Sequence, residues 1–457
     1  MSSLAAAITE LRKTLCGQLI EQGAPTYDDV RRVHNGFIDK RPALVARCLG
    51  AADVADAVRL ARAEGLEIAV KGGGHNVAGR ACVEGGLMID LSLMRQVMVE
   101  PVTRIATAGG GALWRDFNRE TQQFGLATTG GVVSSTGVAG LTLGGGFGWL
   151  MPRFGMALDN LRAVTVVLAD GSVVRADKAS HPDLFWAVRG GGGNFGVATT
   201  LEYHLHPVGP MVTGGIVAHP GPRAKDVLTF YRETTRSLPD EAFLVAAMLT
   251  APDGSGVKIA ALAGQHSGSL ADGEAFARPI KGFGQPVVDV LGPMPYVASN
   301  MMLDDSFQKG TRNYWKSHFL HELSDGAINA LIEQFDGLPT IMSSIVVEHF
   351  HGAATRVPVT DTAYALRDSG YNVVFIAQWQ DPKDDERCIE WSRNAYASLQ
   401  PFGSPRRYMN YLNEDDLQDP DSLTSAYGPN VNRLRQIKKQ YDPENVFHLN
   451  LNIPPAP

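Results

Sequence analysis

Short apolar runs and amphipathic stretches alternate along the first half of the chain. The pattern predicts a strand over 43–48, a helix over 52–64 that ends at Gly65, and a strand over 66–70. Further strands are expected over 86–90, 106–108, 163–168 and 173–176. The Asp170-Gly171 pair between the last two is typical of a hairpin turn. The first part of the chain therefore combines helices with more than one kind of sheet.

The pattern changes after Pro207 and Pro210. Longer helical stretches are predicted over 223–238, 324–335 and 384–399, with strands over 345–350 and 373–379. A second domain is therefore expected to begin near residue 208. The tail loses this periodicity after residue 423 and is expected to fold back onto the first domain.

Two segments raise the question of a membrane or a targeting signal. Residues 1–23 place several leucines on one helical face, but Glu10, Arg12 and Lys13 interrupt any signal-peptide core, so a packed leading helix is predicted. Residues 121–152 carry no charge, but the nine glycines among them argue against a helix there, and so against a membrane span.

Composition narrows the class of protein. A chain of 457 residues is long enough for two or three cores, and its net charge of −7 shows no footprint for nucleic acid or an anionic membrane. The four cysteines are far apart, which suggests neither a zinc ribbon nor a disulfide framework. A reducing compartment, the cytoplasm, fits this usage best. The oligomeric state is not readable from the sequence.

Three glycine-rich segments carry the clearest chemical signal. Residues 71–79 follow a predicted strand, and three successive glycines there let backbone N–H groups approach a phosphate. Alone, this segment could be a tight turn, and it matches neither a Walker loop nor a Rossmann fingerprint. Residues 130–149 and 189–197 add two more such stretches. Together they suit a long cofactor wrapped by loops.

Four segments in order resemble one family, the FAD-linked oxidases of the berberine-bridge-enzyme type within the vanillyl-alcohol-oxidase (PCMH-type) flavoproteins. They are the loop with His75, the block 130–149, PDLFWAVRGGGGNFGV at 182–197 and YDPENVFHLNLNIPP at 441–455. The resemblance spans the chain from about Asn35 to its end. It implies an α+β fold with a PCMH-type FAD-binding domain in two α/β subdomains over 1–207, with its core about 37–207. A substrate domain with an antiparallel sheet flanked by helices is implied over 208–422, and a segment returning to the FAD-binding domain over 423–457.

The resemblance also implies how FAD is held. His75 stands where the family has its covalent anchor to the flavin 8α-methyl carbon; the alternative is a hydrogen-bonded turn histidine. Val133 stands where many relatives carry a second, cysteinyl link, so only one link is expected. The residues expected to bind FAD are His75, Lys71, Gly72, Gly73, Gly74, Asn76, Val77, Gly79, Gly131, Val132, Val133, Ser134, Thr136, Gly137, Gly140, Leu141, Gly144, Gly145, Gly148, Gly196, Val197, Asn450 and Asn452.

The catalytic residues are less clearly marked. Plant relatives place a Glu base where this chain has Asn372, which cannot take a proton at neutral pH. Glu348 is one remaining candidate. The segment Tyr408, Asn410 and Tyr411 resembles the family's Tyr-x-Asn-Tyr, although a tyrosine base needs a lowered pKa.

The resemblance implies an oxidase that removes a hydride from a C–H bond next to a heteroatom and passes the electrons to dioxygen, forming hydrogen peroxide. Its small-molecule substrate could be an amine, an alcohol or sugar, or an intermediate of secondary metabolism. Thr136 occupies the family's oxygen-gating position, where its hydroxyl either bonds the flavin or marks a flavin-N5-oxide oxygenase. A non-catalytic FAD-binding protein is the third reading. His349/His351 and His204/His206 could suggest a metal, but no carboxylate or cysteine accompanies them, so none is expected.

Overall fold

The first sheet forms from short apolar strands around one helix. The computed structural model describes residues 4–457. Its first four strands are β1 (Gln18–Glu21), β2 (Leu44–Arg47), β3 (Ile68–Lys71) and β4 (Leu87–Asp90). They lie in the order β1-β2-β4-β3, and β4 pairs in parallel with β2 and β3. Helix α3 (Ala51–Glu64) buries its apolar side on the sheet and ends at Gly65, whose φ of +66° suits glycine. The predicted strand–helix–strand opening is confirmed.

The leading helix is shorter than predicted. Helix α1 spans Leu4–Thr14, and residues 18–21 form β1, which pairs antiparallel with β2. Residues 1–3 of the predicted helix lie outside the described part. The Asp53 carboxylate accepts the backbone N–H groups of Cys16 (2.9 Å) and Gly17 (3.0 Å). Strand pairing and this contact outweigh the helical periodicity of the leucines, which is only a local preference.

A second sheet is wholly antiparallel. Its strands are β5 (Val97–Glu100), β6 (Ile105–Gly109), β8 (Leu161–Val167), β9 (Val173–Asp177) and β10 (Val197–His204), in the order β5-β6-β10-β8-β9. The predicted Asp170-Gly171 hairpin joins β8 and β9, with Gly171 at φ +79°. Strands β7 (Leu126–Ala127) and β11 (His206–Pro207) form a separate pair.

The prediction that the uncharged segment 121–152 contains no helix is wrong. A six-residue helix, α5 (Val138–Leu143), does form there, and α6 (Met151–Phe154) begins at its end. Helices α4 (Trp114–Thr121) and α7 (Pro182–Val188) complete this half. Among the described residues, no helix is both long enough and apolar enough to cross a membrane.

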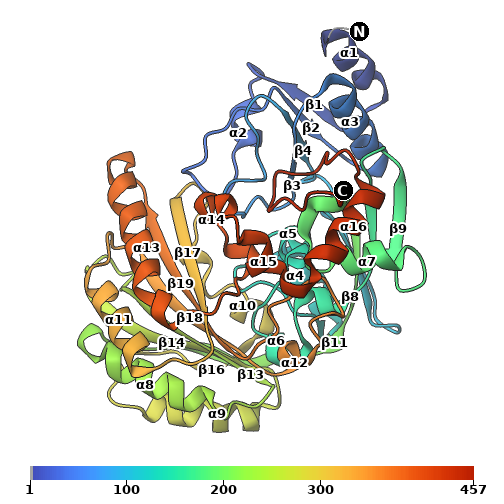
Figure 1. Cartoon of the computed structure of the whole chain (residues 1–457). Coiled ribbons are helices and arrows are strands. Elements are labelled where there is room, and N and C mark those ends of the chain that lie inside the picture. The colour runs from blue at the N-terminus through green and yellow to red at the C-terminus, as the bar shows by residue number, and fades with distance from the viewer. Residues whose placement is uncertain (1–3) are drawn as a thin grey trace.

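The second half is built on one large antiparallel sheet. Its strands are β12 (Met211–Pro220), β13 (Ala242–Thr250), β14 (Lys258–His266), β15 (Val288–Asp289), β16 (Gly292–Pro295), β17 (Arg312–Leu320), β18 (Ser344–Phe350) and β19 (Gly370–Trp379). The order is β15-β12-β14-β13-β18-β19-β17, with β16 also on β12. Helices α8 (Ala224–Thr235), α9 (Leu270–Gly282), α11 (Asp325–Asp336) and α13 (Asp385–Leu399) cover its outer face (Figure 1). Short helices α10 (Tyr296–Ser299) and α12 (Ala353–Arg356) lie in its connections.

The end of the chain runs back from this sheet to the first half. It carries α14 (Glu414–Gln418), α15 (Ser422–Tyr427) and α16 (Val431–Tyr441), which Figure 1 shows in red between the two halves. Leu434, Ile437 and Ile453 share a core with the second sheet and α7. These contacts support the division at residues 207 and 422, which we keep as a proposal.

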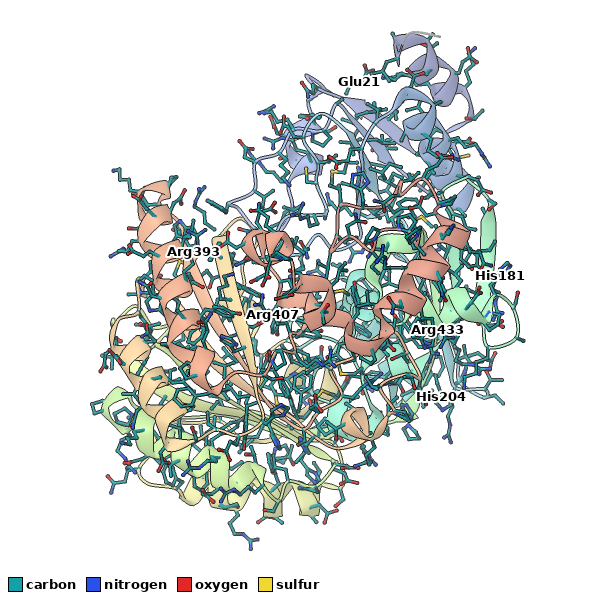
Figure 2. The ribbon with its side chains drawn as sticks, in the orientation of Figure 1. Glu21, His181, His204, Arg393, Arg407 and Arg433 are labelled. Carbon is teal, nitrogen blue, oxygen red and sulfur yellow. The ribbon has the colours of Figure 1, made fainter. Side chains whose placement is uncertain are left out.

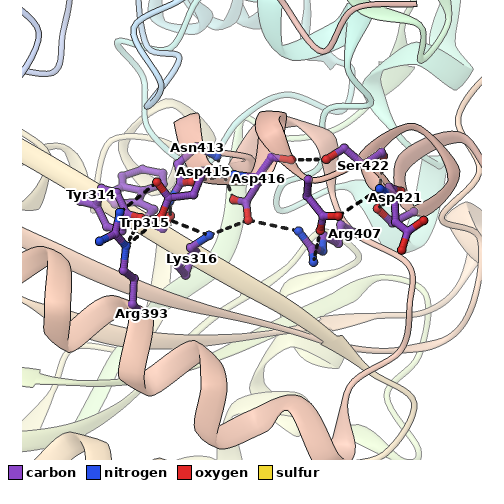
Figure 3. A network of polar contacts seen from close by, with 12 residues as sticks. Tyr314, Trp315, Lys316, Arg393, Arg407, Asn413, Asp415, Asp416, Asp421 and Ser422 are labelled. Carbon is purple, nitrogen blue, oxygen red and sulfur yellow. Dashed lines mark hydrogen bonds and ion pairs between the residues drawn. The ribbon is translucent and has the colours of Figure 1, made fainter.

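An ion-pair network, buried at Lys316 and Asp416, ties the returning segment to β17. Asp416 accepts hydrogen bonds from the Lys316 ammonium (2.7 Å) and the Arg407 guanidinium (3.1 Å), and Asp415 pairs with Arg393 (Figure 3). Figure 2 shows Arg393 and Arg407 near the line where the sheet meets this segment. The network fixes the stretch that follows Tyr411, and so the wall described next.

Candidate functional site

One cavity of about 380 Å³ lies between the glycine loops and the inner face of the large sheet. Of the residues predicted from the sequence, its wall includes Gly72, Gly73, Gly74, His75, Asn76, Val77, Gly131, Val132, Val133, Thr136, Gly137, Gly140, Leu141, Gly144, Gly196, Glu348, Tyr408, Asn410, Tyr411 and Asn450. These residues range from Gly72 to Asn450 along the chain, and folding brings them together around one cavity.

The first two glycine loops touch through their backbones. A Cβ added to Gly73 would lie 2.4 Å from the backbone nitrogen of Gly137, and one added to Gly137 would lie 2.5 Å from that of Gly73. Atoms that close would overlap, so both positions require glycine. The loops therefore form a continuous backbone surface, of the kind that presents N–H groups to a diphosphate.

His75 is held on this surface by two neighbours. Its ring stacks on that of His34, with centroids 3.9 Å apart, and its Nε2 lies 3.0 Å from the Ser135 hydroxyl. Burial, together with the nearby His34, lowers the pKa of His75 to about 3. The imidazole is therefore neutral at pH 7 and can act as a nucleophile.

The opposite wall carries one buried carboxyl group. Glu348 on β18 accepts hydrogen bonds from Asn372 Nδ2 (2.7 Å) and from the Tyr411 hydroxyl (3.0 Å). Burial raises the pKa of Glu348 to about 8, and the two hydrogen bonds oppose this shift. Asn372 pairs with Glu348 across β18 and β19 but is fully buried and does not reach the cavity wall. Glu348, one of the candidates from the sequence, is thus the only carboxyl group among the described wall residues, and it lies on the strand beside that of Asn372.

Tyr408 and Tyr411, the two tyrosines considered as possible bases, remain protonated in this site. The Tyr408 hydroxyl accepts hydrogen bonds from the Gly146 backbone N–H (3.2 Å) and from Asn410 Nδ2 (3.0 Å). Burial raises the pKa of Tyr408, and raises that of Tyr411 well above its usual value. A tyrosinate base needs the opposite shift, so these side chains serve as neutral hydrogen-bonding groups.

Eight predicted residues lie outside the cavity wall: Lys71, Gly79, Ser134, Gly145, Gly148, Val197, Asn372 and Asn452. Lys71 is buried against Asp90 (3.6 Å), and Ser134 donates to the Asp304 carboxylate. A Cβ on Gly148 would meet the Gly130 carbonyl oxygen at 1.9 Å. Lys71, Ser134 and Gly148 thus support the loops from behind, and the contact of all eight residues with a cofactor remains a prediction.

Several wall residues lie in segments whose sequence carries no recognisable signal. His34, Asn313, Trp315 and Phe307 line the cavity from segments without a motif. Trp315 lies edge-on to both Phe307 and Tyr411, with ring centroids 5.9 and 5.7 Å apart. Nothing in the local pattern of Trp315 separates it from a core tryptophan.

The histidine pairs are not joined by further metal ligands. No group of three or more histidine, cysteine or carboxylate side chains among residues 4–457 could hold a metal ion. His349 and His351 are buried outside this cavity, and His204 lies at the periphery of the molecule (Figure 2).

Comparisons with known proteins give the class, a flavin-binding oxidoreductase. Residues 42–177 match the family model described as FAD binding domain, and 408–454 match that of berberine and berberine-like proteins. The chain is 30% identical to an FAD-linked oxidoreductase of Dictyostelium discoideum, covering 98% of this chain and 97% of that one. It is 31% identical to (R)-6-hydroxynicotine oxidase of Paenarthrobacter nicotinovorans, covering 96% and 97%. The crystal structure of 6-hydroxy-D-nicotine oxidase from Arthrobacter nicotinovorans superposes with a TM-score of 0.87 at 29% identity, covering 97% and 99%.

The chain therefore belongs to the FAD-linked, berberine-bridge-enzyme-like oxidoreductases of the PCMH superfamily, and FAD is its cofactor.

Proposed function

We propose that this protein is an FAD-dependent oxidase that removes a hydride from a C–H bond next to a nitrogen or oxygen atom. Bound FAD would supply the hydride acceptor and the site at which dioxygen is reduced to hydrogen peroxide. The observation that carries the proposal is the pairing of a neutral His75 and a buried Glu348 within a single cavity.

His75 is proposed as the covalent anchor. Its Nε2 is engaged by Ser135, which leaves Nδ1 as the nitrogen free to bond the flavin 8α carbon. Val133 lies in the wall where a second link would need a thiol, so a single link is proposed. Backbone N–H groups of the 72–76 loop are proposed to hold the diphosphate.

Glu348 is proposed as the group that takes a proton from the substrate. Its pKa of about 8 suits proton transfer near neutral pH, and the Tyr411 and Asn372 hydrogen bonds stabilise the carboxylate once it forms. Tyr408 and Asn410 hold the glycine block in place beside the substrate, because Asn410 Nδ2 also donates to the Leu141 carbonyl (3.0 Å).

The cavity wall favours a substrate with an apolar body. Strand side chains facing it are Val245, Ala247, Leu249, Val346, Val374 and Ile376. Such a wall offers few partners for the many hydroxyl groups of a sugar, whose burial without hydrogen bonds is costly. An amine or a single alcohol on an apolar ring fits better. The 6-hydroxynicotine oxidase relative supports this choice.

The test uses the purified yellow protein without air. 6-Hydroxynicotine is added first, and then a panel of cyclic amines, benzylic alcohols and sugars. Bleaching of the flavin absorption by an amine or alcohol, followed by peroxide release when air is admitted, supports the oxidase. If no compound bleaches the flavin, the result contradicts the oxidase and favours the alternative of a non-catalytic FAD-binding protein.

The flavin-N5-oxide oxygenase remains the second candidate, because Thr136 lies in the cavity wall. Reaction under labelled dioxygen distinguishes the two. Label in the organic product favours the oxygenase, whereas unlabelled product with labelled peroxide favours the oxidase.

A further inference from the structure

His34 lies flat against the proposed anchor. The rings of His34 and His75 are 3.9 Å apart at an interplanar angle of 25°. The His34 backbone N–H donates to the Gly74 carbonyl (3.0 Å), and its own carbonyl accepts from the Gly310 N–H (2.9 Å). The histidine is thus tied to the glycine loop on one side and to the substrate half on the other.

The residues after His34 make this position rigid. Asn35 Nδ2 donates to the carbonyls of Val77 (2.8 Å) and Asn313 (2.9 Å), and its Oδ1 accepts from the Asn313 N–H (2.8 Å). A Cβ on Gly36 would lie 2.0 Å from the Gly310 carbonyl oxygen. Because both flanks of the segment are fixed in this way, the stacked ring has little freedom to move away from His75.

Ser135 restrains the other side of the imidazole. Its hydroxyl lies 3.0 Å from His75 Nε2, at the tip of a turn whose neighbours are also fixed. The Arg115 N–H donates to the Ser134 carbonyl (2.9 Å), and the Trp114 N–H donates to the Thr136 carbonyl (3.0 Å). Helix α4 therefore holds Ser135 in register with His75.

We propose that His34 and Ser135 are positioning residues for formation of the covalent bond between His75 and the flavin. The Ser135 hydroxyl accepts a hydrogen bond from the protonated Nε2 and so favours the tautomer of His75 whose Nδ1 lone pair is free. His34 fixes the plane of the ring, which keeps that lone pair directed along one line. This inference rests on the anchor described under Proposed function.

The reaction they serve balances with dioxygen as the oxidant. A bond forms between His75 Nδ1 and the 8α carbon, while one C–H bond of the methyl group and the imidazole N–H bond break. The two electrons pass through the flavin to dioxygen, which takes up two protons and becomes hydrogen peroxide. The nucleophile must be neutral for this reaction. The charged or titratable groups that act on His75 are His34 and Arg115, and both favour its neutral form.

The test measures covalent attachment and not turnover. Full-length protein is produced without riboflavin, FAD is added in air, and the flavin that survives acid precipitation is followed with time by absorbance and intact mass. Ser135→Ala and His34→Ala are each expected to slow attachment about tenfold, the effect of one lost hydrogen bond or ring contact on a rate. Ser135→Thr, which keeps a hydroxyl, and His34→Phe, which keeps a flat ring, are expected to restore it.

Two controls separate positioning from folding. In the His75→Ala background, Ser135→Ala and His34→Ala should still bind FAD non-covalently. The attachment rate of the parent should not vary between pH 5 and pH 8, whereas in His34→Ala the opened site should let His75 protonate and slow attachment at pH 5. These two pH values lie below and above the ordinary histidine pKa of about 6.5.

The outcomes are distinguishable. If the parent never retains flavin after acid precipitation, the anchor itself is absent and the proposed function fails at that point. If the parent is labelled and the two alanine variants are labelled equally fast, the anchor stands and the positioning role is overturned. Loss of non-covalent FAD binding in the alanine variants would also overturn it, because the effect would then be structural.

Discussion

The carboxyl group of Glu348 and the side-chain amide of Asn372 face each other on neighbouring strands, 2.7 Å apart. By the resemblance, Asn372 stands where plant relatives place a Glu base, and here it donates a hydrogen bond to a carboxyl group on the neighbouring strand. The proposed proton acceptor would therefore come from a different strand but from the same face of the sheet, since residues 348 and 372 are paired in register.

Glu348→Gln should remove the proton acceptor while keeping the shape of the side chain. With a substrate that does not itself titrate, flavin reduction by the parent is expected to rise with pH and to level off above about 8, because only the carboxylate can accept a proton. The variant should be slower by at least about 100-fold and should show no such rise. Stopped-flow reduction without air at several pH values measures both. A variant with the parent's pH profile would remove Glu348 from the chemistry.

The same substitution has a predicted effect on stability. The pKa of Glu348 is raised from about 4.5 in the unfolded chain to about 8 in the folded protein, so the folded state holds the proton more tightly. Stability of the parent is therefore lost as the pH rises between these two values. Glu348→Gln does not titrate, so its melting temperature minus that of the parent should increase from pH 5 to pH 8. A constant difference would show that the carboxyl pKa is not raised.

His75→Ala should leave the fold intact and release the flavin on acid precipitation, whereas the parent should keep it. The reason is that the side chain supplies the proposed bond, while the backbone of the loop supplies the remaining contacts. Asn76→Ala is a matched control, because it alters the next side chain of the same loop, which also lies in the cavity wall. Equal release from parent and His75→Ala would contradict the covalent link.

The sequence was most informative for features that neighbouring residues determine, such as helices, turns and glycine-rich loops. The strand–helix–strand opening, the Asp170-Gly171 hairpin and the three long helices of the second half followed from periodicity and turn residues, and the glycine loops pointed to the cofactor. Helix α9 was not singled out, since Gly273 and Pro279 weaken its pattern. His34 could not be found, because its role depends on a stack with a residue 41 positions later in the chain.

Asp416→Asn should destabilise the seam between the sheet and the returning segment. Asp416 is buried and pairs with Lys316 and Arg407, so its loss leaves the buried Lys316 ammonium with only the more distant Asp415 (3.9 Å). Breaking a buried ion pair from one side costs about 3–5 kcal/mol. Glu414→Gln, which removes an exposed partner of Arg80, should change stability by less than about 1 kcal/mol. Urea unfolding of the three proteins compares them, and equal midpoints would contradict the importance of the network.

Gly73→Ala tests whether the two glycine loops really share one surface. The new methyl group would lie 2.4 Å from the Gly137 nitrogen and 2.6 Å from its Cα, so the loops must separate. Overpacking of this kind costs about 1–3 kcal/mol and should also lower the amount of flavin retained, because the separated loops no longer present their N–H groups together. Gly292→Ala is the matched control, since no atom lies within 4 Å of the added carbon. Melting temperature and flavin content are measured on all three proteins. If Gly73→Ala matches the control in both, the close approach of Gly73 and Gly137 is not needed for FAD binding, and the cradle must be formed by other amides of the 72–76 loop.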